Sequence, residues 1–456
     1  MLIDTHCHLD FKDFDMDRGA VLERAKASGV GRIINVGSSL EGSKRSVELA
    51  GKHDMVYASV GVHPHDAKSV TGEAFNVLRD LARSPKVVAI GEVGLDYYRN
   101  LSPKRDQIEV FERFAALAGE LNLPLIIHAR ECQDEILKLL SSAVNGRRMT
   151  GVVHCFSGDA KFLGRCLDLG FYVSFTCNLT FKNAKTLREA AKMMPVERLL
   201  LETDAPYLSP EGMRGRRNEP ASVAILADEW SKILGLSKED IERITTNNAN
   251  SLFSLGLGAA PKIAYEIRDS LYLNITNRCT NACDFCIRTK TQFVKGHNLK
   301  LDSEPSVEEI LRAVGDAKRY REIVFCGYGE PTLRLDAIKA VAAELKKTGT
   351  KVRLNTNGHG DLINKRSIAS ELKGLIDSFS VSLNTDTEKA YNDLCRSEFG
   401  SAGYAAVKEF IRSGLANGIA VDVTFLDLPG VDMERCRKIA ADLGAKFRQR
   451  HLGVVG

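Results

Sequence analysis

Short apolar runs alternate with amphipathic segments along most of the chain. In the first two thirds, eight runs rich in Val, Ile and Leu predict strands, at residues 2–8, 32–37, 56–63, 87–92, 124–128, 151–155, 171–176 and 199–204. The segments between them have helical spacing, as at residues 105–121, where Ile108, Phe111 and Phe114 recur on one face. Near-continuous apolar strands separated by helices indicate a parallel sheet covered on both faces. Eight such units predict an α/β fold of the (β/α)8 TIM-type barrel kind rather than a doubly wound sheet.

The C-terminal third repeats the alternation with fewer strands. They are expected at residues 271–276, 322–326, 351–355, 378–383 and 421–426, with a weaker sixth strand at 447–452. Helices are predicted between them, for example at 307–320 and 433–443. Six strands are too few to close an eightfold barrel, so this part is predicted to be a partial (β/α)6 barrel. The small-residue stretch 255–261 separates the two parts and gives domains of residues 1–256 and 262–456.

Length and composition agree with this division. A chain of 456 residues is long for a single core. Met1 leads directly into the first apolar run, and no apolar run approaches the ~20 residues that span a bilayer. The 11 cysteines are mostly scattered singly, which is typical of buried free thiols in a reducing cytoplasm. We therefore expect a cytoplasmic protein with no membrane segment. Its net charge of +4 permits an anionic substrate without demanding one.

Histidines and carboxylates gather at the ends of the first set of strands. His6 and His8 lie two apart on the first strand, so both side chains face the same way. Four more polar residues are predicted to close a strand each: Glu92, His128, His154 and Asp204. In a parallel barrel the carboxyl ends of the strands carry the catalytic groups. One histidine at a strand end is more often structural than metal-binding, but six such residues together predict divalent metals, arranged as a bridged pair.

The motifs around these residues resemble those of the TatD family of metal-dependent deoxyribonucleases, within the amidohydrolase-like metal hydrolases. They are Asp4-Thr5-His6-Cys7-His8-Leu9-Asp10, Gly61-Val62-His63-Pro64, Gly91-Glu92-Val93-Gly94-Leu95-Asp96-Tyr97-Tyr98, Ile127-His128-Ala129-Arg130, His154-Cys155-Phe156-Ser157-Gly158 and Glu202-Thr203-Asp204-Ala205-Pro206-Tyr207-Leu208. The resemblance covers about residues 1–256. It implies two divalent ions (Zn, Mg or Mn) bound by His6, His8, Glu92, His128, His154 and Asp204. It also implies catalytic roles for Glu92, Asp204 and His63.

Other polar residues near these motifs have weaker cases. His63 and His65 lie in a strand-end loop, where each is either a substrate contact or a solvated side chain. Three arginines follow the last strand of the barrel: Arg214, Arg216 and Arg217. Arginine forks suit phosphate oxygens, although such a charge run is often only a solvated face. Asp96 either orients a metal ligand or caps the helix that follows it.

Two substrates stay open for the barrel. The resemblance implies stepwise 3′–5′ removal of nucleotides from DNA, with a preference for single strands. Some relatives instead resemble deacylases that hydrolyse the ester of mischarged aminoacyl-tRNA, again at a nucleic-acid 3′ end. Both reactions direct a metal-activated hydroxide at an electrophile beside a phosphate. Aromatic and basic residues are little interleaved, which favours recognition of strand ends over a long single-strand channel.

A different metal pattern follows the first strand of the C-terminal part. Cys279, Cys283 and Cys286 have C-x3-C-x2-C spacing, with Phe285 just before the last cysteine. Three thiolates hold three irons of a four-iron cluster and leave the fourth iron open. A zinc site is the alternative, but it requires a fourth ligand, and the nearest candidate is His297. The loop resembles that of the radical S-adenosylmethionine (SAM) superfamily, and the combination resembles the TatD-associated radical SAM proteins.

This second resemblance implies a 4Fe-4S cluster on the three cysteines and reductive cleavage of SAM to a deoxyadenosyl radical. The matching motifs are Gly327-Tyr328-Gly329-Glu330-Pro331, Asn355-Thr356-Asn357-Gly358 and Ser382-Leu383-Asn384. The residues implied to contact SAM are Gly329, Glu330, Asn355, Ser382 and Asn384. An electron donor such as flavodoxin or ferredoxin is the implied partner.

Three hypotheses for the whole chain follow. In the first, a DNA hydrolase is fused to a radical SAM enzyme whose substrate the sequence leaves open. In the second, an aminoacyl-tRNA deacylase is joined to a radical domain that serves the same RNA. In the third, the C-terminal part is a cluster-bearing sensor without radical chemistry. The intact cysteine and SAM motifs favour an enzyme. We therefore expect a bifunctional protein that acts on nucleic acid, either DNA or the 3′ end of tRNA.

Overall fold

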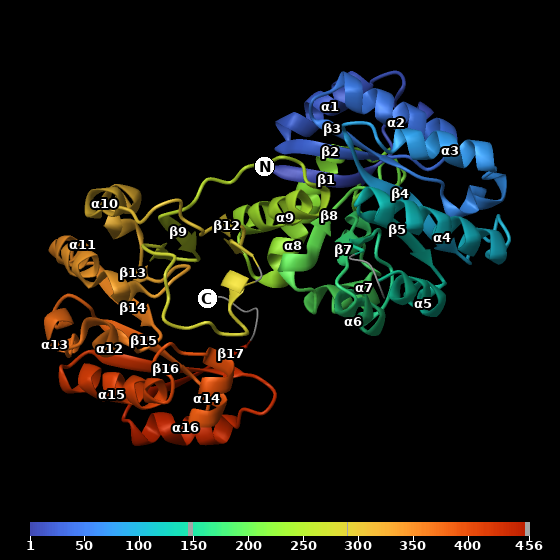
Figure 1. The fold of residues 1–456 in the computed structure, drawn as a ribbon. Helices are drawn as coiled ribbons and strands as arrows, with labels where there is room; N and C mark the ends of the chain where they lie inside the picture. The colour runs from blue at the N-terminus through green and yellow to red at the C-terminus, as the bar shows by residue number, and fades with distance from the viewer. Residues whose placement is uncertain (145–148, 290, 452–456) are drawn as a thin grey trace. The chain divides into compact units, whose positions relative to one another are not determined.

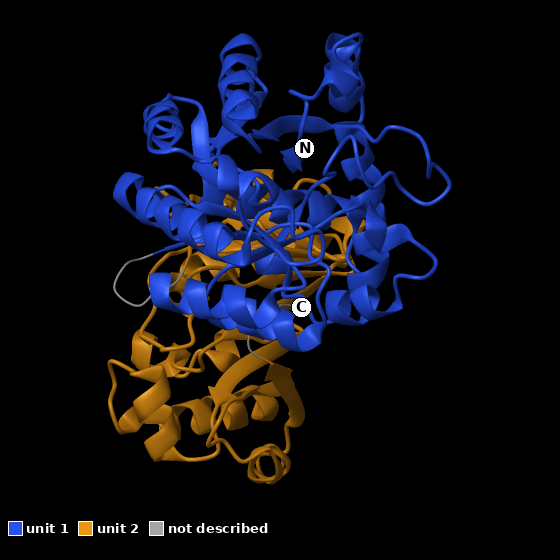
Figure 2. Ribbon diagram, turned by 90° about the vertical axis from the view of Figure 1, so that its right-hand side faces the viewer, with its two compact units in different colours: residues 1–258 blue, residues 259–456 orange. Residues whose placement is uncertain are grey.

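The computed structural model describes residues 1–144, 149–289 and 291–451. Two units with separate hydrophobic cores make up the chain, Met1–Gly258 and Ala259–Gly456 (Figure 2). The division falls within the small-residue stretch 255–261. Residue 452, the last of the predicted sixth C-terminal strand, lies outside the described residues.

Eight parallel strands form the centre of the first unit, and each pairs with the next along the chain. They are β1 (Leu2–Cys7), β2 (Val30–Val36), β3 (Val56–Val60), β4 (Val87–Asp96), β5 (Leu125–Arg130), β6 (Gly151–Val153), β7 (Tyr172–Phe175) and β8 (Leu199–Leu201). Backbone hydrogen bonds join the two ends of this order. The N–H of His8 donates to Ala205 O (2.8 Å), and the N–H of Asp204 donates to His6 O (2.9 Å). The predicted (β/α)8 barrel is therefore confirmed.

Helices surround this barrel (Figure 1). They are α1 (Arg18–Ala27), α2 (Leu40–Lys52), α3 (Gly72–Leu81), α4 (Lys104–Leu121), α5 (Gln133–Val144), α6 (Ala160–Asp168), α7 (Lys185–Lys192), α8 (Val223–Leu234) and α9 (Lys238–Phe253). The helix predicted at 105–121 is α4, and its buried Phe111 and Phe114 recur at helical spacing because they pack on the barrel. Leu252 of α9 packs in one cluster with Ile126 of β5 and covers the amino end of the barrel. The functional site of the first unit is therefore expected at the carboxyl end of the barrel.

The strand ends differ in detail from the predicted ones. Glu92 and His128 lie within β4 and β5, whereas His154 and Asp204 follow the ends of β6 and β8. The prediction that each of these residues closes its strand is therefore wrong. β4 extends to Asp96 because its last residues continue to pair with β5, after one register shift. β6 and β8 are short, so the residues after them leave the sheet and turn over the barrel mouth.

The second unit contains a seven-stranded sheet in the order β17-β16-β15-β14-β13-β10-β9. The strands are β9 (Ala264–Ile267), β10 (Ser270–Leu273), β13 (Glu322–Phe325), β14 (Lys351–Thr356), β15 (Ser378–Asn384), β16 (Ala420–Asp427) and β17 (Lys446–His451). The six strands of this sheet other than β9 are parallel, as predicted for a partial barrel. β9 was not predicted, and it adds an antiparallel edge. A short ribbon of β11 (Phe293–Val294) and β12 (His297–Asn298) forms a separate sheet.

Helices cover one face of this open sheet (Figure 1). They are α10 (Val307–Val314), α11 (Leu335–Lys347), α12 (Gly360–Asn364), α13 (Ala369–Leu372), α14 (Glu388–Cys395), α15 (Ala402–Ala416) and α16 (Met433–Asp442). The helix predicted at 307–320 ends at Val314, because Gly315 takes a positive φ of 62° and stops it. Phe379 of β15 stacks on Phe410 of α15 in the core between the sheet and these helices.

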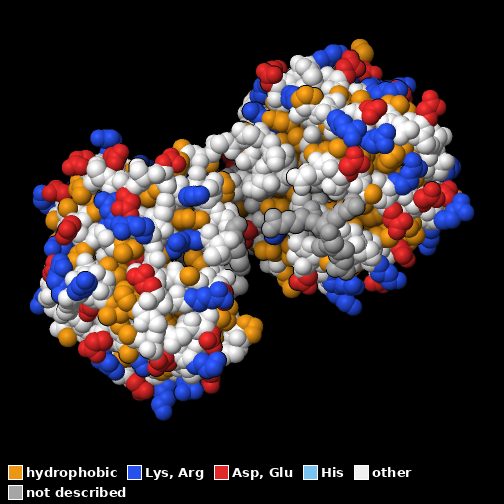
Figure 3. All heavy atoms as spheres, viewed as in Figure 1, with side chains coloured by type: hydrophobic (Ala, Val, Ile, Leu, Met, Phe, Trp, Pro, Cys, Tyr) orange, Lys and Arg blue, Asp and Glu red, His pale blue; other side chains and the backbone are white. Residues whose placement is uncertain are grey.

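The surface carries charges of both signs. Lys and Arg are interspersed with Asp and Glu over the face drawn in Figure 3, in keeping with the small net charge of +4. Trp230, the single tryptophan, is fully buried against Phe175. None of the described helices is long and apolar enough to cross a membrane.

Candidate functional site

The structure brings all six predicted metal-binding residues of the first unit together at the carboxyl end of the barrel. They come from five segments: His6 from β1 and His8 just after it, Glu92 from β4, His128 from β5, His154 after β6 and Asp204 after β8. Most of this group is buried, and Glu92 is only 3% exposed. Residues remote in the sequence thus present their donor atoms to one small volume.

Glu92 lies at the centre of this group. Its Oε1 is 2.8 Å from His128 Nδ1 and 2.8 Å from His154 Nε2. Its Oε2 lies 3.6 Å from His6 Nε2 and 3.8 Å from His8 Nε2. The two oxygens of one carboxylate therefore approach two different pairs of histidine nitrogens.

Asp204 completes the group on the Oε2 side. Its Oδ1 lies 3.7 Å from His6 Nε2 and 3.6 Å from His8 Nε2, and these two nitrogens are 3.2 Å apart. The other nitrogen of His8, Nδ1, lies 2.9 Å from the carbonyl oxygen of Val36, which fixes the ring. A nitrogen that donates to this carbonyl leaves Nε2 as the lone-pair donor that a metal requires.

The electrostatics of the group follow from packing carboxylates and imidazoles together out of water. Burial opposes ionisation of Glu92, but His154 and the other imidazoles outweigh it and hold the pKa of Glu92 well below its usual range. Burial likewise opposes protonation of His8, but Asp204 and Glu92 raise the pKa of His8 to about 9. The ionised carboxylates therefore need nearby positive charge, from protonated histidines or from cations in their place.

His63 and Asp96 extend the site. His63 follows β3, and its Nε2 lies 3.5 Å from Glu92 Oε1. Burial lowers the pKa of His63 to about 3, so the imidazole is neutral at pH 7. Asp96 Oδ2 lies 3.2 Å from His128 Nε2 and 2.9 Å from His65 Nε2. The N-cap of α4 is Pro103. Of the two roles open for Asp96, its contacts therefore fit the orientation of His128.

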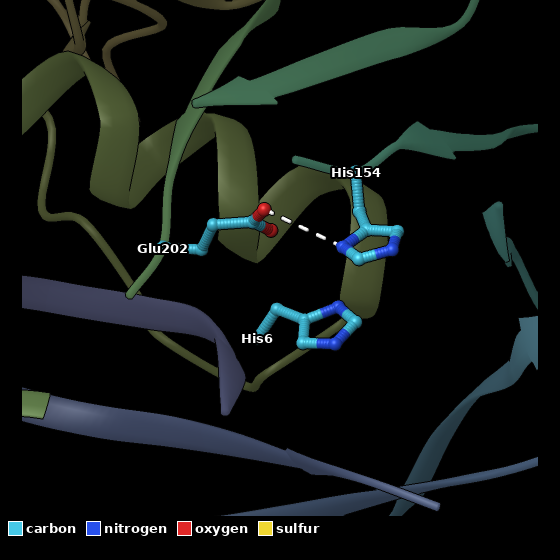
Figure 4. A group of neighbouring side chains, drawn as sticks. All are labelled: His6, His154 and Glu202. Atoms are coloured by element: carbon cyan, nitrogen blue, oxygen red, sulfur yellow. Dashed lines mark ion pairs between the residues drawn. The ribbon is translucent and has the colours of Figure 1, made fainter. Parts of the chain in front are cut away.

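Glu202 is a site residue that the sequence analysis missed. Figure 4 shows its carboxylate directed at His154, whose ring stacks on that of His6. Glu202 Oε1 lies 3.5 Å from His154 Nδ1 and accepts the N–H of Cys155 at 2.6 Å. It therefore fixes the orientation of a predicted metal ligand. The signal was its position two residues before Asp204, since alternate residues of an extended segment share a face.

The three predicted phosphate-binding arginines have different surroundings. Arg214 and Arg216 line a cavity of about 510 Å³ together with Tyr207, and Arg214 stacks on Phe181. Arg217 also borders the cavity, but its guanidinium forms ion pairs with two carboxylates. These are Asp17 (2.7 Å) and Glu219 (2.9 Å). The structure thus gives Arg217 a structural use that the sequence analysis did not foresee.

In the second unit the three cysteines lie in a loop after β10, where each is partly exposed. The end of α14 and the segment after it hold this loop through backbone hydrogen bonds. Ala282 N–H donates to Cys395 O (3.2 Å), and Glu398 N–H donates to Thr280 O (2.9 Å). A hydrogen bond with the Cys395 thiol, together with burial, raises the pKa of Cys283 above its usual range. The loop is therefore braced from outside by a segment that the sequence analysis did not connect with it.

The predicted SAM-contacting residues surround the same loop. A Cβ on Gly329 would clash with the carbonyl oxygen of Arg278, so only glycine allows this close approach to the cysteine loop. Glu330 is buried and accepts hydrogen bonds from Thr332, from the Thr356 hydroxyl (2.8 Å) and from the Asn357 N–H (2.7 Å). Its carboxylate therefore joins the loops that follow β13 and β14.

The remaining three residues lie on β14 and β15. Asn355 is half-buried, and its Oδ1 accepts a hydrogen bond from Arg353 (2.7 Å). Ser382 is half-buried and contacts the Thr424 hydroxyl at 3.4 Å. Asn384 is buried and donates to Cys395 Sγ at 3.6 Å. These contacts place Asn384 beside the segment that braces the cysteine loop.

Comparison with known proteins decides the family. Residues 3–254 match the family model described as TatD related DNase, and residues 273–443 match the radical SAM superfamily model. The chain belongs to the TatD-related DNase family. Its second unit is a radical SAM domain, and both resemblances drawn from the sequence are confirmed. The chain therefore joins a metal-dependent hydrolase domain to a radical SAM enzyme domain.

Individual relatives agree with this assignment for the first unit. The uncharacterized metal-dependent hydrolase YabD of Bacillus subtilis is 43% identical over 255 residues, which are 56% of this chain and 100% of the relative. The 3′-5′ ssDNA/RNA exonuclease TatD of Pantoea ananatis is 37% identical over 56% of this chain and 100% of its own length. The crystal structure of YJJV, a TatD homologue from Escherichia coli K12, superposes with a TM-score of 0.53 at 32% identity, covering 56% of this chain and 98% of that one.

Proposed function

We propose that the first unit is a dinuclear metal-dependent exonuclease that removes nucleotides from the 3′ end of single-stranded DNA. The placement of Glu92 carries this proposal. Its Oε1 lies 2.8 Å from His128 Nδ1, and its Oε2 lies 3.6 Å from His6 Nε2. A carboxylate that faces two donor groups in this way is suited to bridge two cations. The similarity to the 3′-5′ ssDNA/RNA exonuclease TatD of Pantoea ananatis supports the direction and the strand preference.

The residues present fit a pair of divalent ions such as Zn, Mg or Mn. One ion would be held by His6, His8, Asp204 and Glu92 Oε2, and the other by His128, His154 and Glu92 Oε1. Imidazole nitrogens and carboxylate oxygens are ligands of this ion class. The two carboxylates are also ionised, as binding requires, because their pKa values are lowered by the surrounding histidines against the effect of burial. When bound, such a pair supplies Lewis acidity and lowers the pKa of a coordinated water.

The side chains of the chain position the substrate and move the proton. Asp204 is ionised and accepts the proton of the attacking water. His63 is neutral and lies 3.5 Å from Glu92 Oε1, so it can hydrogen-bond a phosphate oxygen beside the ions. Arg214 and Arg216 line the cavity beside Tyr207 and would hold the next phosphate of the strand. Arg217 lines the same cavity and helps to shape it.

An oligodeoxynucleotide labelled at either end tests this proposal. The unchanged protein should release labelled mononucleotide first from the 3′-labelled strand, and Glu92→Gln should slow the release by about 10²–10³-fold or more. His53→Ala is the matched control, because His53 lies at the end of α2 and outside the site. Release of the amino acid from mischarged aminoacyl-tRNA, without any release of mononucleotides, would contradict the exonuclease and support the deacylase.

We further propose that the second unit binds a 4Fe-4S cluster through Cys279, Cys283 and Cys286 and uses SAM to act on a nucleic-acid substrate. Gly329, Glu330, Asn355, Ser382 and Asn384 would form or support the SAM site. A flavodoxin or ferredoxin would supply the electron. The close contact of Gly329 with Arg278 supports this assignment, because it holds the loop after β13 against the cysteine loop. When present, the cluster and SAM supply a deoxyadenosyl radical.

Anaerobic reconstitution tests the second proposal. The protein is loaded with iron and sulfide, and iron content and visible absorbance are measured. 5′-Deoxyadenosine is then followed after addition of SAM and dithionite. Cys283→Ala should lose the iron and the product. Cys436→Ala should keep both, since Cys436 is buried in α16. A loaded cluster that yields no deoxyadenosine would contradict radical chemistry and leave the second unit as a sensor.

A further inference from the structure

The last strand of the second unit carries a row of cations on one face. Along β17, side chains alternate between the two faces of the sheet. Phe447 faces the helices, because it lies beneath Arg437 of α16. The residues on the opposite, inner face are Lys446, Arg448 and Arg450, which we call the basic wall.

The basic wall lies on the face of the sheet opposite α16, where all three of its side chains are exposed. In register on β16, Asp422 lies beside Lys446, whereas Thr424 and Leu426 lie beside Arg448 and Arg450. Only the first cation therefore has a carboxylate next to it on the sheet. Among residues 1–144, 149–289 and 291–451, neither Arg448 nor Arg450 forms an ion pair. Both arginines are exposed, and without a carboxylate partner among the described residues their guanidinium groups are available to an anionic ligand.

A cavity of about 300 Å³ opens on this inner face. It is lined by, among others, Arg321, Arg353, Ser378, Asp422 and Arg448. Two of these arginines are neutralised, since Arg353 pairs with Glu322 (2.9 Å) and Arg321 with Asp269 (2.8 Å). Arg448 is not held in such a pair within the described ranges, so its charge remains directed at the cavity.

The positions of Arg448 and Arg450 along β17 connect the cavity with the proposed SAM site. Arg448 pairs in register with Thr424, which contacts Ser382, one of the residues assigned to SAM. Arg450 is near enough to oppose the burial that raises the pKa of Cys326, an inner-face thiol just after β13. The basic wall therefore runs from the cavity toward the end of the barrel that carries the cysteine loop.

We infer that the basic wall and this cavity bind successive phosphates of a single nucleic-acid strand, the substrate of the radical SAM domain. Arg448 and Arg450 are two residues apart on one face, which separates them by about 7 Å. Each guanidinium presents two parallel donors that match a phosphate. A ligand with a repeated anion satisfies such a row, whereas a lone carboxylate satisfies one member. The inference rests on the proposed radical function for the reaction, but the binding is independent of it.

Arginine modification locates the site directly. Reconstituted full-length protein with Glu92→Gln, which protects the strand from hydrolysis, is treated with phenylglyoxal with and without a single-stranded oligodeoxynucleotide. Modified arginines are identified by peptide mass mapping. Modification of Arg448 and Arg450 should slow about fivefold when the strand is present at four times its Kd. Arg435 and Arg437 on α16 serve as internal controls and should react at unchanged rates.

Two further measurements distinguish the nucleic-acid strand from SAM as the ligand of Arg448 and Arg450. SAM alone should leave Arg448 and Arg450 reactive; protection by SAM alone would overturn the inference, as would no protection by the strand. In binding titrations, Arg448→Gln combined with Arg450→Gln should reduce the slope of log affinity against log salt by about 1.4, at about 0.7 per phosphate contact. Lys438→Gln on α16 should leave the slope unchanged. Absence of deoxyadenosine while protection persists would count against the radical reaction and support the binding site.

Discussion

The two units build their candidate sites in different ways. In the first unit, a closed barrel brings side chains from five segments to one point, with donor atoms 2.8–3.8 Å apart around Glu92. In the second, all three cysteines lie in one loop after β10, and neighbouring segments brace that loop. The candidate metal site thus depends on the closure of the whole sheet, whereas the candidate cluster site depends on a few contacts such as that of Gly329 with Arg278.

This difference predicts which substitutions should disrupt each site. A substitution at the centre of the first site should remove its chemistry without unfolding the barrel, because the core lies in separate apolar clusters. A substitution of a residue that contacts the cysteine loop of the second site should act by displacing that loop. A substitution in one site should therefore reduce the activity of that unit and leave the activity of the other unchanged.

The largest expected effect is that of Glu92→Gln. The change removes the charge that both donor groups share, so nucleotide release should fall by about 10²–10³-fold or more. Metal content should fall with it, as measured by mass spectrometry of the dialysed protein. Deoxyadenosine formation by the second unit should be unchanged. Loss of both activities together would break the comparison, because it would make the two sites a single system.

The second effect is that of Glu330→Ala in the other unit. The buried carboxylate accepts hydrogen bonds from Thr356 and from the Asn357 N–H, and its removal leaves these donors unpaired. We expect the free energy of unfolding of the second unit to fall by about 2–4 kcal/mol. Denaturant titration, with iron release as the signal of unfolding, measures this change in free energy. Glu344→Ala on the exposed side of α11 is the control. Nuclease activity that falls in parallel with iron content would contradict the independence of the units.

The sequence could predict those features that depend on local pattern. Continuous apolar strands and helical spacing predicted both barrels, and the family motifs predicted Glu92 and the five residues that meet around it. Glu202 escaped because its role depends on Cys155 and His154, which approach it only in the closed barrel. The exact strand ends escaped for a similar reason, since the pairing of β4 with β5 determines them.

In the second unit the missed features are those made by segments far apart in the chain. β9 is only four residues long, and it is an edge strand only because it folds back on β10. The contact of Cys395 with the cysteine loop joins residues more than a hundred positions apart, and an isolated cysteine gives no signal of it. The SAM-facing roles and the phosphate-binding roles stay predictions.

A smaller effect is expected from Asp96→Asn. Asp96 lies 3.2 Å from His128 Nε2 and orients that ring toward Glu92. Loss of its charge should reduce metal affinity or activity by about 10–100-fold, the range typical of a residue that orients a metal ligand. Metal titration should show one ion weakened more than the other. Equal weakening of both ions would show that Asp96 does not act through His128.

The smallest effects separate two neighbouring arginines. Arg217→Gln should lower the free energy of unfolding by about 0.5–1 kcal/mol, because it breaks partly exposed ion pairs with Asp17 and Glu219. Arg216→Gln should leave stability unchanged and raise KM for the oligonucleotide. Thermal unfolding and steady-state kinetics measure the two variants side by side. The opposite pattern would reassign phosphate binding to Arg217.

The central claim is that Glu92 bridges two cations in the first unit, and manganese binding tests it most directly. Metal-free protein is titrated with Mn²⁺ while bound ions are counted and their electron paramagnetic resonance spectrum is recorded. The account predicts two ions per barrel with a spin-coupled spectrum, and Glu92→Gln should lose the coupling. A single uncoupled ion in the unchanged protein at saturation would contradict it.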